Sequence, residues 1–148
     1  MAIDFTARRV VVCGGSRGIG RSIALGFAAA GADVSICARS AGPLEATRGE
    51  LAAHGHIAHA AACDLADADS IASYIGRAAT ALGGIDMLVN NASGFGSSDD
   101  EAGWGASVAV DIMAVVRASQ AALPHLEQGQ GSCIVSVRAG EGMDALVA

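Results

Sequence analysis

The stretch "VVVCGGSRGIGRSIA", from Val10 to Ala24, decides the fold. A short β-branched run leads through four glycines into a helical pattern, whose expected core-facing stripe is Ile19, Ile23 and Phe27. Glycine permits backbone angles that a side chain would forbid, and a helix that begins there offers unpaired N–H groups and a partial positive charge. The stretch therefore predicts a strand, a turn that can bind an anion, and a helix. The alternative is a tight turn without a ligand.

The rest of the chain alternates between the same two patterns. Further strands are expected at 34–38, 57–63, 85–89 and 132–137. Helices are expected around three sets of apolar positions: Leu44, Thr47 and Leu51; Ile71, Ile75, Ala78 and Leu82; and Trp104, Val108, Ile112, Val115 and Leu126. This alternation predicts an α/β fold, a doubly wound parallel sheet of strand order 3-2-1-4-5. Ligands of such sheets bind at the carboxyl ends of the strands, where the strand order reverses.

Composition sets further limits. The chain has 148 residues, 52% of them hydrophobic, which predicts one domain over 1–148 with 139–148 as an irregular tail. A net charge of −6 argues against binding to nucleic acid or an anionic membrane. Neither a signal-peptide pattern nor an apolar stretch of membrane-spanning length is evident. Small buried thiols in a reducing cytoplasm are the expectation for the four dispersed cysteines, Cys13, Cys37, Cys63 and Cys133.

Several ordered motifs resemble the short-chain dehydrogenase/reductase family along nearly the whole chain. They are the Gly14-x-x-x-Gly18-x-Gly20 spacing, "CDL" at 63–65, "IDMLVNNAS" at 85–93, "ASQAALPHL" at 118–126 and "GSCIVSV" at 131–137. Cys13 and Ser93 stand where the family has threonine and glycine. The resemblance implies a Rossmann-type domain that ends after its fifth strand and binds a nicotinamide dinucleotide.

The resemblance also implies which residues bind the cofactor. The diphosphate and the adenosine ribose would be lined by Gly14, Ser16, Arg17, Gly18, Ile19 and Gly20. Asp64 would accept a hydrogen bond from the adenine amino group, with Leu65 beside it. Asn91 would lie near the ribose; the alternative is a turn residue that caps its own backbone.

Arg17 and Arg39 bear on the choice of cofactor. An NAD site has an acidic residue after its second strand, but here Ala38 occupies that place and Arg39 follows. Two guanidinium groups would flank a 2′-phosphate, because arginine donors form a planar fork that matches phosphate. This favours NADP(H) over NAD(H); the alternative is two solvated surface arginines.

The family's catalytic residues find no counterpart, so no catalytic residue is assigned. In the family a tyrosine helped by a lysine exchanges the proton, a serine polarises the substrate and an asparagine holds a water. This chain has no lysine; Tyr74 lies on a different helix, and Ala139, beside Arg138, and Asp111 align with the serine and the asparagine. Two hypotheses remain. The first is the cofactor-binding part of an NADP-dependent oxidoreductase for an unidentified small carbonyl or alcohol, homo-oligomeric at full length. The second is a non-catalytic dinucleotide-binding or interaction protein.

Three histidines and an acidic run carry no functional assignment. His54, His56 and His59 lack the cysteine or carboxylate spacing of a metal site, so a solvated loop and no metal are expected. The run 99–101 predicts a negatively charged helix start.

Overall fold

A five-stranded parallel sheet organises the computed structural model, which describes residues 3–129 and 131–137. The strands are β1 Arg9–Cys13, β2 Asp33–Ala38, β3 Ala58–Ala62, β4 Met87–Asn90 and β5 Cys133–Ser136. Their order is β3-β2-β1-β4-β5, and each neighbouring pair is parallel. The predicted 3-2-1-4-5 sheet is confirmed. The order reverses between β1 and β4, so the crevice expected to hold a ligand lies at the carboxyl ends of these two strands.

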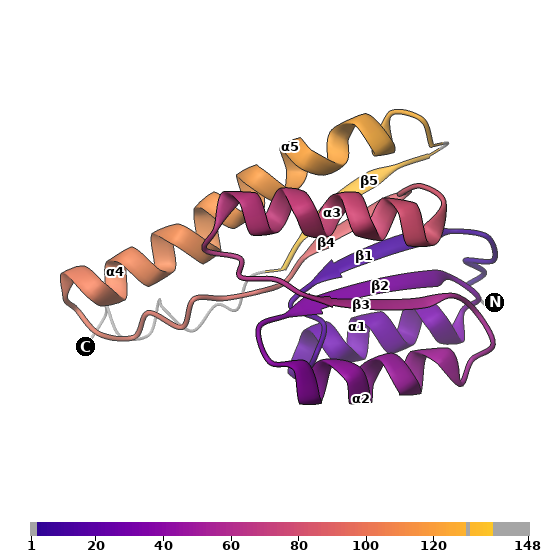
Figure 1. Ribbon diagram of the computed structural model, residues 1–148, viewed down its shortest axis with the longest axis horizontal. Helices are drawn as coiled ribbons and strands as arrows, with labels where there is room; N and C mark the ends of the chain where they lie inside the picture. The colour runs from indigo at the N-terminus through magenta and orange to yellow at the C-terminus, as the bar shows by residue number, and fades with distance from the viewer. Residues whose placement is uncertain (1–2, 130, 138–148) are drawn as a thin grey trace.

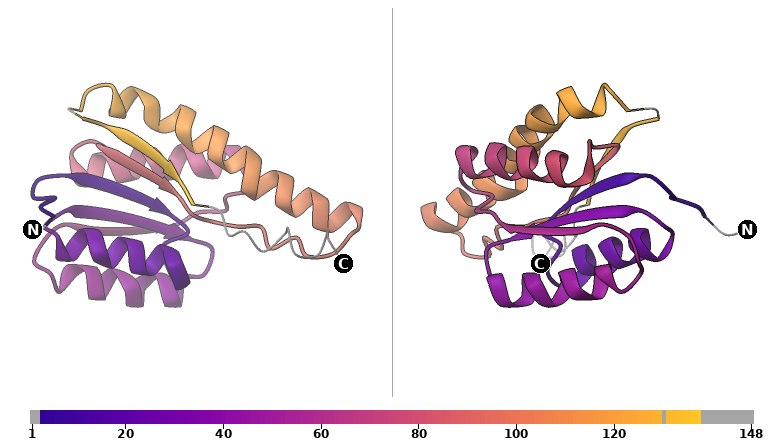
Figure 2. Two further views of the ribbon diagram at one scale, coloured as in Figure 1. Left: turned by 180° about the vertical axis from the view of Figure 1, so that it is seen from behind. Right: turned by 45° about the vertical axis from the view of Figure 1, so that its right-hand side comes forward.

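Helices cover both faces of the sheet (Figure 1). They are α1 Gly18–Ala29, α2 Ala41–Ala52, α3 Ala68–Leu82, α4 Glu101–Ser107 and α5 Ala114–Leu126, with a π-helix, η1, at Val108–Met113. On one face α1 packs beside α2, and on the other α3 packs beside α5. Figure 2 shows α4, η1 and α5 as one long rod whose α4 end extends past the sheet.

The strand β1 is the centre of the core. Val10, Val11 and Val12 are fully buried, and their side chains alternate between two apolar clusters, one on each face. A strand covered on both faces needs apolar residues at every position, because each side chain contacts a helix layer. The continuous β-branched run of the sequence therefore reflects burial on two sides.

The predicted apolar stripe of α1 is confirmed in part, because Ile23 and Phe27 are half-buried against the core. The residues that α1 buries are Gly20, Ala24 and Ala28, whereas Ile19 is 59% exposed. Small residues face the sheet because α1 approaches β1 too closely for longer side chains. The larger apolar residues of α1 therefore lie on its flanks.

The long helix shows the same effect more strongly. Trp104, Val108 and Ile112, which belong to its predicted apolar stripe, are exposed. The residues that α5 buries are Ala114, Ala118, Ala122 and Leu126. Alanines at this four-residue spacing let α5 lie close against α3 and β4.

The run Glu101–Leu126 also corrects an expectation about membranes. This continuous helical run of 26 residues is long and apolar enough to cross a membrane, as judged by length and composition alone. No such stretch was expected from the sequence, in which polar residues interrupt the apolar ones. In the structure α5 packs against the sheet layer as a covering helix.

Two further expectations need correction. Cys13, Cys37 and Cys63 are buried as expected, but Cys133 is exposed, because β5 lies at the sheet edge and all four of its residues are exposed. His59 belongs to β3 rather than to a solvated loop, and its Nδ1 atom lies 2.8 Å from Ser35 Oγ.

An ion pair closes the amino-terminal end of the sheet. The Arg9 guanidinium donates from Nε and Nη2 to the two oxygens of Asp86, at 2.9 and 2.8 Å, and the Arg9 backbone N–H donates to the same carboxylate. These hydrogen bonds hold the pKa of Asp86 below its usual value, although burial opposes them. The pair joins the start of β1 to the segment that precedes β4.

We expect Asp86→Asn to lower the free energy of unfolding by about 2–3 kcal/mol at pH 7, since three charge-assisted hydrogen bonds weaken together. The folded-state pKa of Asp86 lies below its unfolded value, so this stabilisation is present above the unfolded pKa of about 3.9 and is lost as the pH falls through the folded pKa. Urea denaturation at pH 7 and at pH 3 measures both effects. The control Glu45→Gln, which removes an exposed partner of Arg48, should change little. An equal loss at both pH values for Asp86→Asn would contradict the linkage.

Candidate functional site

The glycine turn, residues 14–17, connects β1 to α1. At Gly15 in the turn and at Gly20 in α1, neighbouring atoms lie too close for a side chain. A Cβ atom on Gly20 would lie 2.0 Å from the carbonyl oxygen of Gly14, and one on Gly15 would lie 2.5 Å from Ile36 Cγ2. Gly14 and Gly18 both have positive φ, at 82° and 56°, in the left-handed region that favours glycine. The spacing of the glycines is thus required by close approach of α1 to β1 and by backbone conformation.

Hydrogen bonds hold the start of the turn to the neighbouring strands. The N–H groups of Gly14 and Gly15 both donate to the carbonyl of Cys37 at the end of β2, at 3.0 and 3.1 Å. Asn91 Nδ2 donates to the carbonyl of Gly14 at 3.2 Å. These hydrogen bonds therefore hold the turn in place at the carboxyl ends of the central strands.

The amino terminus of α1 can bind an anion. Its first turn, Gly-Ile-Gly-Arg, carries no negative charge, and among the described residues Arg17 makes no side-chain capping hydrogen bond. A Cβ atom on Gly18 would meet no described heavy atom within 4 Å, so the approach to the backbone is open. The helix N-terminus offers N–H donors and a partial positive charge to that space. These features fit a diphosphate group.

Arg17 and Arg39 both follow strands that end at the carboxyl edge of the sheet. Arg17 precedes α1 and Arg39 follows β2, and both side chains are exposed. Within the described part of the chain, neither guanidinium forms a hydrogen bond or an ion pair. Both arginines are therefore available to an anionic ligand.

The segment after β3 holds Asp64 and Leu65. Asp64 is exposed, and its Oδ1 atom accepts a hydrogen bond of 3.0 Å from the N–H of Ala66. The N–H of Asp64 donates to Ser70 Oγ, which fixes the segment to the first turn of α3. Leu65 is buried beneath it. The structure thus holds Asp64 at the carboxyl edge of the sheet, with Leu65 contributing to the core.

Asn91 connects two parts of the site. Its amide does not cap its own turn, because it donates across to the glycine turn. Two residues that the sequence did not mark as cofactor-binding also shape the turn, Gly15 and Thr47. Thr47 is a polar residue in the otherwise apolar stripe of α2, and that was the signal in the sequence.

Tyr74 is part of the core. It is fully buried on α3, and its hydroxyl lies 2.8 Å from Ser35 Oγ, which in turn contacts His59. Burial raises the pKa of Tyr74 well above its usual value, and burial, with the charge of Arg77, lowers the pKa of His59. A buried phenol with a raised pKa cannot exchange protons with a ligand in the crevice.

The other positions aligned with catalytic residues differ in placement. Asp111 lies in η1, and its Oδ2 atom accepts a hydrogen bond of 3.3 Å from the N–H of Gly94. It thus fastens the loop after β4 to the long helix. Arg138 and Ala139 lie outside the described residues, as does the tail 139–148.

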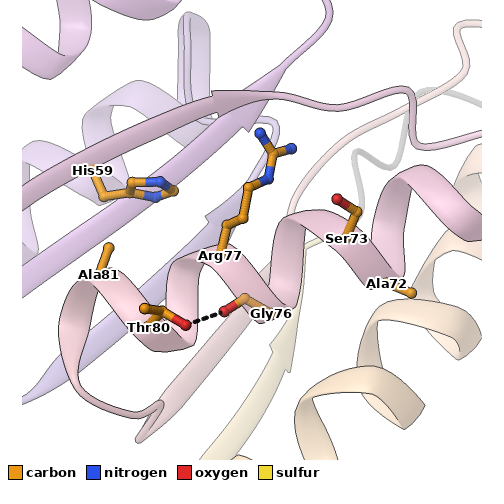
Figure 3. Close-up of a pocket in the computed structure, with 7 residues that line it drawn as sticks. All are labelled: His59, Ala72, Ser73, Gly76, Arg77, Thr80 and Ala81. Carbon is orange, nitrogen blue, oxygen red and sulfur yellow. Dashed lines mark hydrogen bonds between the residues drawn. The ribbon is translucent and has the colours of Figure 1, made fainter.

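An open groove of about 660 Å³ lies elsewhere, between α3 and β3 (Figure 3). His59, near the amino end of β3, lines the groove together with α3, and Arg77 extends from α3 to donate to the carbonyl of Ala62 at the other end of β3, at 3.3 Å. The glycine turn follows the carboxyl end of β1, so the groove and the turn are separate features. Within the residues that the structure describes, no three His, Cys, Asp or Glu side chains are placed to hold a metal ion.

This arrangement of sheet, glycine turn and crevice defines a nucleotide-binding α/β protein. The family model "short chain dehydrogenase" matches residues 8–147, and the chain belongs to that family. The resemblance drawn from its motifs is thereby confirmed.

Individual relatives agree with this assignment. The chain is 33% identical to the isoepoxydon dehydrogenase of Penicillium expansum, over 85% of this chain and 50% of that protein. It is similar to a Burkholderia cenocepacia short-chain dehydrogenase solved with NADP, at 42% identity and a TM-score of 0.83, over 92% of this chain and 56% of the other. It also resembles a 7α-hydroxysteroid dehydrogenase solved with NADH and 7-oxoglycochenodeoxycholic acid, at 26% identity and a TM-score of 0.86, over 93% and 55% of the two chains. The chain thus spans about half the length of these relatives, and the two solved structures contain NADP and NADH respectively.

We expect Gly20→Ala to destabilise the protein by about 1–3 kcal/mol, because its Cβ atom would lie 2.0 Å from the Gly14 carbonyl and force α1 away from β1. Gly26→Ala is the matched control on the same helix, where a Cβ atom would meet no described atom within 4 Å. That variant should be more stable than the parent by about 0.5–1 kcal/mol, since alanine favours helix. Urea denaturation of both variants measures the difference; equal stabilities would refute the close-approach argument.

Proposed function

We propose that this chain forms the NADP(H)-binding part of an oxidoreductase that transfers hydride between a nicotinamide and a small carbonyl or alcohol substrate. The observation that carries the proposal is the open α1 terminus at Gly18, together with Arg17 and Arg39, which have no side-chain partner among the described residues. The backbone N–H groups would bind the diphosphate, and the two guanidinium groups would bind a 2′-phosphate. When bound, the cofactor supplies the hydride chemistry.

The remaining site residues would orient the adenosine. Asp64 is held at the crevice edge with one carboxylate oxygen on its own turn, so the other oxygen is placed to accept from an adenine amino group. Asn91 would act on the ribose side chiefly by fixing the glycine turn. NADP in the Burkholderia cenocepacia relative supports the choice of cofactor, since it is among the more similar solved structures.

A second candidate, a non-catalytic dinucleotide-binding protein, is favoured by one observation. Tyr74, the single tyrosine of the chain, is buried in the core, and the chain contains no lysine. The two candidates share cofactor binding and differ in turnover. In either case we propose self-association of the whole protein, because Trp104, Val108 and Ile112 present an exposed apolar surface on α4 and η1.

Arg39→Asp tests the cofactor assignment. We expect NADPH affinity to fall by roughly tenfold or more, since a charged hydrogen bond is replaced by repulsion of the 2′-phosphate, and NADH affinity to rise relative to it. Calorimetric titration with both cofactors measures the change. Arg48→Asp makes the same charge change on α2 at a residue that pairs with Glu45, and it should leave the preference unaltered. An unchanged NADPH preference in Arg39→Asp would refute the role of Arg39.

Turnover separates the two candidates. We expect the 148-residue chain to bind NADPH without reducing ketones or aldehydes, because the carbonyl oxygen needs a proton donor as hydride arrives. A positioned general acid contributes about 10²–10⁴-fold to such a step, and arginine cannot shuttle protons. NADPH absorbance with a panel of carbonyl compounds measures the rate. Consumption that scales with protein concentration and survives further purification would show that these residues suffice for catalysis.

A further inference from the structure

Thr47 makes an unusual contact for a residue within a helix. It lies on α2 and is 1% exposed, and its hydroxyl donates to the carbonyl of Ser16 at 3.0 Å. A threonine in a helix commonly bonds to a carbonyl of its own helix, one turn earlier. Here the hydroxyl reaches out of α2 to the glycine turn, 31 residues earlier in the chain.

The contact fastens a part of the turn that the other hydrogen bonds do not reach. Cys37 and Asn91 hold Gly14 and Gly15, at the start of the turn. Thr47 holds Ser16, the residue directly before Arg17. The position of the Arg17 backbone therefore depends on α2.

Arg39 lies between the end of β2 and the start of this same helix. Arg39 is followed by Ser40 and then by the first residue of α2, Ala41. The Thr47 hydrogen bond thus joins the element that follows Arg39 to the residue that precedes Arg17. Thr47 is buried at this contact, whereas both arginine side chains are exposed.

We propose that Thr47 is a positioning residue for 2′-phosphate recognition, which holds Ser16 and Arg17 at the correct distance from Arg39. The proposal rests on the proposed function, because it concerns the same cofactor site. Thr47 itself would not touch the cofactor. Its effect would appear as a change in the preference between two cofactors that differ by one phosphate group.

The test compares NADPH and NADH binding to the full chain, by fluorescence titration, for three variants. Thr47→Val keeps the shape and removes the hydroxyl; we expect NADPH affinity to fall roughly threefold to tenfold, the loss of one hydrogen bond. NADH affinity should change by less than about twofold, because the diphosphate site at Gly18 remains. Thr47→Ser keeps a hydroxyl and should therefore retain the NADPH preference of the parent.

Glu50→Gln is the matched control. Glu50 also joins α2 to α1, through an exposed ion pair with Arg21, but one turn farther along α2 from the glycine turn. It should leave both affinities unchanged. Thermal unfolding is recorded for every variant, and Thr47→Ala replaces Thr47→Val if the valine is not accommodated.

Each outcome bears on the proposal. Equal loss of NADPH and NADH affinity would overturn it, since Thr47 would then support the turn without setting specificity. Unchanged affinities in a Thr47→Val variant, with a parent that prefers NADPH, would overturn it and leave the proposed function intact. A parent that bound neither cofactor would overturn the proposed function and this proposal together.

Discussion

The contact between α1 and the carbonyl of Gly14 is the constraint on which the rest of the structure depends. Gly20 lies against that carbonyl, and a Cβ atom would lie only 2.0 Å from it. Because no side chain intervenes, α1 begins directly beside the end of β1, and its free N–H groups face the crevice. The same carbonyl accepts from Asn91, so one backbone oxygen organises the turn, α1 and the segment after β4.

Close approach recurs on the other face of the sheet with alanine in place of glycine. Ala114, Ala118 and Ala122 form the buried side of α5, while bulkier apolar residues such as Ile112 and Leu123 are exposed. Burial in this protein therefore follows side-chain size as much as hydrophobicity. Helix faces formed by glycine and alanine let the helices pack close to the sheet. The larger apolar side chains then lie on the surface, where they can contact other proteins.

The site divides its tasks between backbone and side chains. Backbone N–H groups at α1 provide a binding surface for phosphate that needs no charged side chain, and they are held by hydrogen bonds from β2 and Asn91. In our proposal the exposed Arg17 and Arg39 select among phosphate ligands, and the buried hydroxyl of Thr47, which donates to Ser16, helps to position Arg17. Tyr74, by contrast, does not face the crevice: its hydroxyl is buried in the core and forms a hydrogen bond with Ser35.

The sequence by itself determined the order of the elements and the parallel sheet, whereas the anion site at the glycine turn stays a prediction. Local patterns carry that information, because β-branched runs and glycine spacing depend on neighbours in the chain. It also predicted the buried face of α3, where Ile71, Ile75, Ala78 and Leu82 are all buried. Only the tertiary structure decided which side of α1 and α5 is buried, that Thr47 reaches Ser16, and that Tyr74 meets Ser35. These features depend on the distance between elements remote in sequence, and no local period of hydrophobicity specifies how closely two such elements approach.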